Sequence, residues 1–112
     1  MSHTTSLTQN RDFRQLYARG RHAAGPCLAM YCRKNRLGLI RLGLTVSVKL
    51  GPAVQRNRIR RRIREAYRLQ EDVFLPGHDV VIVARFRAKS ASFSDLSREL
   101  AGLGRKLGIA QT

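Results

Sequence analysis

The fold of this chain is decided by residues 51–68, which read GPAVQRNRIRRRIREAYR. Gly51-Pro52 predicts the start of a helix, because proline is favoured in the first helical turn, and the helix should run to about residue 69. At 100° per residue its apolar side chains form one continuous stripe: Ile59, Ile63, Ala66 and Tyr67. That stripe must pack on a sheet.

The segments around this helix predict a small α+β sandwich with helices on a three- or four-stranded sheet. Before it we expect a helix over 8–19 capped by Thr8, a short strand or extended segment over 21–24, and strands over 27–33 and 39–47. After it come a nearly all-apolar inner strand over 79–86 and a helix over 92–107, capped by Ser92 with Asp95 or by Ser94 with Ser97. Residues 1–7 are polar, and we expect them to be loose.

The strand over 39–47 alternates in a way that predicts one buried and one open face of the sheet. Leu42, Leu44 and Val46 point to the buried side, and the other side carries little bulk: Arg41, Gly43, Thr45 and Ser47. Tyr31 shares its strand face with Cys27 and Ala29, so we expect this ring on the open side.

The charge of the chain points to a polyanionic partner. Its 112 residues, enough for one domain, carry 22 Lys and Arg against 7 Asp and Glu, a formal net charge of +15, and 18 of the cations are Arg. Because the planar guanidinium forks onto phosphate and stacks on bases, nucleic acid is favoured over an anionic membrane. No apolar stretch is long enough to span a bilayer, and the N-terminus lacks an apolar signal core, so we expect a cytoplasmic protein.

The basic helix carries seven Arg and one Glu between residues 56 and 68. Arg56, Arg60, Arg64 and Arg68 form a row on one flank of the apolar stripe. Arg58, Arg61 and Arg62 spread over the other flank and outward. A calmodulin-target or membrane-surface helix is weakened by the core's need for the apolar face. A DNA-binding domain is weakened by the lack of a dimer seam. The composition also fits a ribosomal or general RNA-binding protein.

The remaining chemistry-bearing residues predict no catalytic or metal site in the protein itself. The acidic residues are scattered, and only Glu71-Asp72 are adjacent, with side chains that diverge. Cys27 and Cys32 lie five apart in a predicted strand, which places them on opposite faces and predicts reduced, structural thiols. We expect Tyr67 in the core and His22 and His78 in surface or structural positions.

Residues 41–47 (RLGLTVS) together with 51–68 closely resemble the protein subunit of bacterial ribonuclease P. The hallmark of that family is an Arg-Asn-Arg helix after a segment similar to GLSVSKKxGxAVxRNR. Residues 10–20 (NRDFRQLYARG) look like the family's first helix and residues 76–85 (PGHDVVIVAR) like its last strand. Val48, Pro52 and Arg62 stand where the family often carries Lys, a polar or basic residue, and an aliphatic residue.

The resemblance implies a ribosomal protein S5 domain 2-like fold, with element order α-β-β-β-α-β-α on a four-stranded sheet. It also implies a protein, monomeric in itself, that binds a large catalytic RNA and aids removal of the 5′ leader of precursor tRNA, with Mg²⁺ held by that RNA. By motif position, contacts to the RNA subunit fall to Arg56, Asn57, Arg58, Arg61 and Arg62. Contacts to the single-stranded leader fall to Phe13, Tyr17, Tyr31, Arg60 and Arg64. The helix spacing of Phe13 and Tyr17 also allows a core role for either ring.

Overall fold

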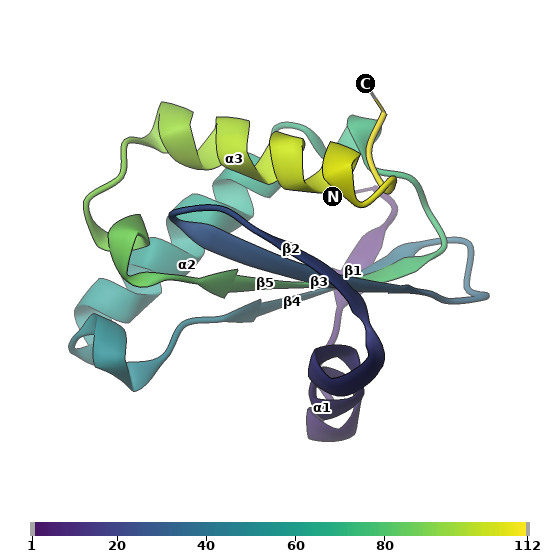
Figure 1. Ribbon diagram of the computed structural model, residues 1–112, viewed down its shortest axis with the longest axis horizontal. Coiled ribbons are helices and arrows are strands. Elements are labelled where there is room, and N and C mark those ends of the chain that lie inside the picture. The colour runs from purple at the N-terminus through teal and green to yellow at the C-terminus, as the bar shows by residue number, and fades with distance from the viewer. Residues whose placement is uncertain (1, 112) are drawn as a thin grey trace.

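A computed structural model describes residues 2–111 and confirms the predicted α+β fold (Figure 1). The helices are α1 (Asn10–Arg19), α2 (Ala53–Arg68) and α3 (Phe93–Lys106). The strands are β1 (Thr4–Ser6), β2 (Arg21–Ala24), β3 (Leu28–Lys34), β4 (Ile40–Thr45) and β5 (His78–Ala84). Three short 3-10 helices connect them: η1 (Val48–Leu50), η2 (Glu71–Val73) and η3 (Phe86–Lys89).

The strands form one mixed sheet in the order β1-β4-β5-β3-β2. β5 pairs parallel with β4 and antiparallel with β3, so the prediction of an inner strand from its apolar run is confirmed. The six residues His78–Val83 pair with a strand on each side, and four of them are apolar, as a strand buried on two faces requires.

The N-terminal segment differs from the prediction, because residues 4–6 form a fifth strand parallel to β4. The Thr4 hydroxyl bonds the Tyr67 hydroxyl at 2.7 Å and donates to the buried Glu71 carboxylate. A three-residue edge strand made of Thr and Ser carries no apolar alternation, which is why a loose segment was expected. Thr8 does not cap α1, which begins at Asn10 with Gln9 as its N-cap; Met1 lies outside the described residues.

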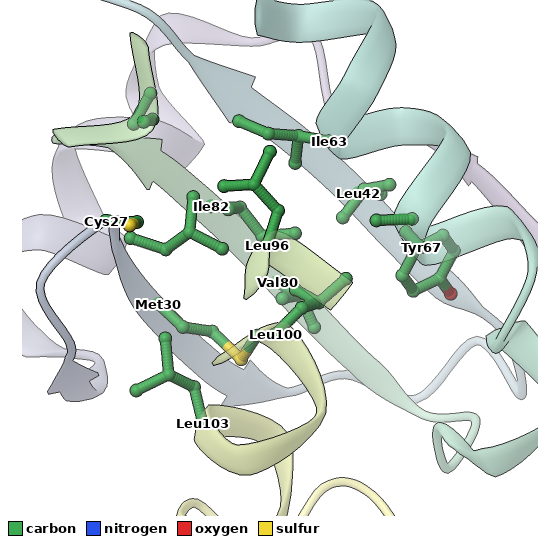
Figure 2. Close-up of a cluster of buried hydrophobic side chains, with 14 of the residues drawn as sticks. Cys27, Met30, Leu42, Ile63, Tyr67, Val80, Ile82, Leu96, Leu100 and Leu103 are labelled. Atoms are coloured by element: carbon green, nitrogen blue, oxygen red, sulfur yellow. The ribbon is translucent and has the colours of Figure 1, made fainter. Parts of the chain in front are cut away.

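Helices α2 and α3 cover one face of the sheet and bury the main core (Figure 1). The predicted stripe of α2 is buried, and the Ser92 hydroxyl caps α3 by accepting from the Asp95 N–H. Figure 2 shows side chains of the sheet meeting those of both helices in this layer: Met30, Leu42, Val80 and Ile82 from strands, Ile63 and Tyr67 from α2, Leu96, Leu100 and Leu103 from α3. No helix within residues 2–111 is long and apolar enough to cross a bilayer.

Both cysteines lie in this same core, so the expectation of opposite faces was wrong. Cys27 comes before β3, in the turn from β2, where the alternation of a strand does not apply. The two thiols are free and buried, and burial raises the pKa of each. They are therefore packing residues rather than reactive ones.

The opposite face is covered only in part, by α1 alone (Figure 1). Leu16 is fully buried in a small second cluster with Leu7 and Val81. Gly43 makes room for Phe13 here: a Cβ at this position would lie 2.6 Å from the Phe13 ring, so glycine lets the ring lie directly on β4. The rest of this face stays open, as the alternation of residues 39–47 predicts.

Candidate nucleic-acid interface

Four aromatic rings form a continuous row on the open face. Phe13 and Tyr17 of α1 lie 6.5 Å apart between ring centroids, and Tyr17 meets Tyr31 of β3 edge-on at 5.1 Å. Tyr31 in turn stacks on His22 of β2, with centroids 5.4 Å apart and ring planes 26° apart. The row crosses the sheet from the side of β4 to the edge strand β2.

The rings of this row are accessible to different degrees. Tyr17 is 40% exposed and is held by a 2.7 Å hydrogen bond between its hydroxyl and that of Thr45. Phe13 and Tyr31 are half-buried and pack partly against the Leu16 cluster, so each combines a packing role with an exposed part of its ring. His22 is exposed. Beside His22 and Tyr31, Ala24 and Ala29 carry short side chains.

A groove of about 270 Å³ opens beside Phe13 at the β1 edge of the sheet. β1 ends at Ser6, opposite Leu42, whereas β4 continues to Thr45. The last residues of β4 therefore extend beyond β1 and form one wall of the groove. Arg60 and Arg64 of α2 reach the same groove, and the remaining lining is rich in hydroxyls: Thr4, Thr5, Ser6 and Thr8. Apolar ring, hydroxyls and guanidinium groups therefore converge in one place.

The Arg side chains of the basic helix α2 differ in exposure and in their hydrogen-bond partners. Arg64 is exposed, and Arg60 donates from Nη1 to the side chain of Asn57 at 2.8 Å. Arg56 is half-buried and donates to the Gly51 carbonyl, and Arg68 is paired with Glu65. Within the row 56, 60, 64 and 68, only the two central residues reach the groove.

The other flank of α2 holds Arg58 and Arg62, which line a hollow with Gln55 and Lys89. Arg62 is half-buried, and its Nη2 donates to the Ala91 carbonyl at 2.7 Å, so it ties the segment before α3 to α2. Arg61 points outward from the helix rather than into this hollow. It borders a shallow hollow with Asn57, Arg60 and Arg64, because its Cα lies on the outward side of the helix, nearer to the groove flank.

A buried ion network fixes α1 to the end of the sheet. The Asp79 side chain is 1% exposed and accepts from Arg33 at 2.9 Å, from Arg41 at 2.6 Å and from Asn35 at 2.8 Å. Asp12 of α1 pairs with the same two arginines. Burial alone would raise the pKa of Asp79, but the hydrogen bonds from Arg41, Asn35 and Arg33 outweigh it and lower the pKa. The helix that carries Phe13 and Tyr17 is thus held in one position.

Known proteins similar to this chain identify its family. The family model described as Ribonuclease P matches residues 1–108. The chain belongs to the ribonuclease P protein family. The ribonuclease P protein component of Clostridioides difficile (strain 630) is 40% identical over 108 residues, covering 96% of this chain and 95% of its own.

Solved ribonuclease P proteins share the fold. The protein from Staphylococcus aureus superposes with a TM-score of 0.85 at 30% identity, over 95% of this chain and 97% of its own. The protein from Thermotoga maritima gives 0.82 at 28% identity, over 89% and 96%. The chain is therefore a subunit of ribonuclease P, an endoribonuclease that takes part in maturation of the tRNA 5′ end. Membership also decides against the calmodulin-target, membrane-surface and DNA-binding alternatives.

Two parts of the ribonuclease P protein surface were missed from the sequence. The hydroxyl wall of β1 was missed because the strand itself was not expected. His22 was assigned to the surface without a role, although the alternation of 21–24 places it on the same side as Tyr31 once the two strands pair antiparallel. That pairing is the signal that could have found it.

The carboxylates of this ribonuclease P protein do not fit a metal centre. Asp12 and Asp79 are engaged by arginines, and Glu71 accepts from Thr4 and from the backbone N–H groups of Ser2 and His3. Glu99 accepts from the N–H of Cys27 and Leu28. Within residues 2–111, His, Cys, Asp and Glu form no group of three or more that could hold a metal ion. We therefore derive no catalytic step through a metal bound by the protein.

Proposed function

We propose that this protein binds the catalytic RNA of ribonuclease P and holds the single-stranded 5′ leader of precursor tRNA, while the RNA subunit performs the phosphodiester hydrolysis with its own Mg²⁺. The observation that carries the proposal is the convergence of Phe13, Arg60 and Arg64 on one groove that continues into the aromatic row. Unpaired bases stack on aromatic rings, and guanidinium groups bind the phosphates between them.

The two sides of α2 serve two RNAs in this proposal. Arg60 and Arg64 face the groove and would contact the leader. Arg58 lies on the opposite flank and would contact the RNA subunit, with Asn57 and Arg61 on the outward surface between the flanks. Arg56 and Arg62 each donate one N–H to a backbone carbonyl. Their remaining N–H groups would contact the RNA.

The test compares precursor and mature tRNA on the holoenzyme assembled with the cognate RNA subunit. Phe13→Ala and Tyr17→Ala should weaken precursor binding by about fivefold or more and leave mature tRNA binding unchanged, because only the precursor carries a leader to stack. Leu37→Ala is the matched control, since Leu37 is 56% exposed in a loop away from the groove.

Thermal unfolding of each variant separates binding from packing, because Phe13 also contacts the Leu16 cluster. An equal loss of affinity for both tRNAs, or a large fall in Tm that accounts for the binding loss, would assign the ring to packing and contradict the proposal.

A further inference from the structure

His22 forms the end of the aromatic row that lies on the edge strand β2. It lies in β2, the outer strand of the sheet on this side, directly opposite Tyr31 of β3. The two rings stack at 5.4 Å with planes 26° apart, and the imidazole is exposed. The imidazole therefore covers part of the Tyr31 ring and presents its own outer side to solvent.

The surroundings of His22 leave room for a flat ligand. Ala24 lies two residues from His22 along β2, Gly20 lies just before the strand, and the residue opposite Ala24 is Ala29. None of these side chains extends beyond a Cβ. α1 makes its main sheet contacts with β3, and the imidazole of His22 is exposed.

The contacts of Tyr31 limit where a base can stack at the His22 end of the aromatic row. Tyr17 meets Tyr31 edge-on at 5.1 Å, and His22 stacks on it from the β2 side. A nucleotide arriving from the β2 side must either displace His22 or stack on His22 itself. A ring already stacked on a half-buried neighbour is pre-positioned, so stacking on it costs little ordering of the protein.

We propose that His22 is the terminal base-stacking platform of the leader path, adding one unpaired nucleotide to those held by Phe13, Tyr17 and Tyr31. This inference rests on the proposed leader-binding function and assigns a residue to it that the family motif does not supply. His22 acts as a specificity-determining residue: it favours precursors whose leader is long enough to reach β2.

The experiment measures Kd of the holoenzyme for precursor tRNAs whose leaders are lengthened one nucleotide at a time. The wild-type protein should gain affinity stepwise with leader length. His22→Ala should lose one of these steps, about fivefold in Kd, and leave the others in place. His22→Phe should restore the step, because it keeps a flat ring, and Leu37→Ala should match the wild type.

The outcomes separate this inference from the proposed function. If His22 merely covers Tyr31, His22→Ala will bind long leaders as well as or better than the wild type, which overturns the inference alone. Loss of the step in both His22→Ala and His22→Phe also overturns it, since a ring would then not be sufficient. If the wild type shows no gain with leader length, the proposed leader-binding function itself fails.

Discussion

At the scale of single residues, Asp79 is the group on which the position of α1 depends. Its carboxylate is buried beneath two arginines that also hold Asp12. The arginine side chains remain 27–28% exposed, so their own desolvation is incomplete. If the central carboxylate is lost, Asp12 is the one carboxylate of this network that remains for both arginines.

Replacing Asp79 by Asn should lower the free energy of unfolding by about 3 kcal/mol, since it removes the buried charge at the centre of the network and leaves Asp12 to compensate two arginines. Asp95→Asn is the control: its pair with Arg98 is exposed, with N and O atoms 4.0 Å apart, and should change stability by less than about 0.5 kcal/mol. Urea unfolding of both variants checks this. Equal, small effects would show that the network is dispensable.

The same residue sets a pH dependence. Burial opposes ionisation of Asp79 and of Glu71, but hydrogen bonds to each carboxylate outweigh it and lower both pKa values from ordinary values of 3.8 and 4.5. A carboxyl whose pKa is lower in the folded state adds stability above its unfolded pKa and loses it as the pH falls through the folded pKa. Unfolding free energy should therefore be flat near neutral pH and fall below about pH 4.5. Asp79→Asn should make that fall shallower; an unchanged slope would contradict the assignment.

At the scale of elements, α2 is a helix with two exposed flanks separated by a buried stripe. We expect Arg60→Ala and Arg64→Ala to weaken precursor affinity, and Arg58→Ala to weaken assembly with the RNA subunit. Each lost phosphate contact should reduce the log–log salt slope by about 0.7–0.9. Two titrations per variant measure this, one against the RNA subunit and one against precursor tRNA on the holoenzyme. If all three variants impair both titrations alike, α2 is one undivided basic surface.

Elements with strong apolar periodicity could be predicted from the sequence. The stripe of α2, the alternation of β4 and the apolar run of β5 each leave one arrangement that buries them. β1 could not be predicted, because its three residues are held by pairing with β4 and by the Thr4 hydroxyl contacts to Tyr67 and Glu71, more than 60 residues away. For the candidate site, the family motif indicated which residues to expect. Their exposure and hydrogen bonds could not be predicted, because these depend on tertiary contacts such as that between Arg62 and Ala91.

At the scale of the whole molecule, the proposed function has a protein of net charge +15 lie between two polyanionic RNAs, where it would reduce their repulsion. The protein should therefore raise precursor cleavage by the RNA subunit most at low magnesium, with the benefit shrinking as magnesium screens the phosphates. Cleavage assays across a magnesium series, with and without protein, measure this. Cleavage by the protein in the absence of the RNA subunit, abolished by mutating an acidic residue, would overturn the assignment of catalysis to RNA.

The position of β5 at the centre of the sheet has a consequence for how the chain folds. β5 is the last strand in sequence, yet it lies between β4 and β3 and joins the two halves of the sheet. Until residue 84 is available, β3 can pair only with β2, and β4 only with the three residues of β1. Most contacts of the sheet therefore close late and over long sequence separations, which slows folding relative to a helical bundle of this size. During synthesis, the part of the aromatic row beside β4 and the part on β3 and β2 can be joined only after the strand between them has left the ribosome.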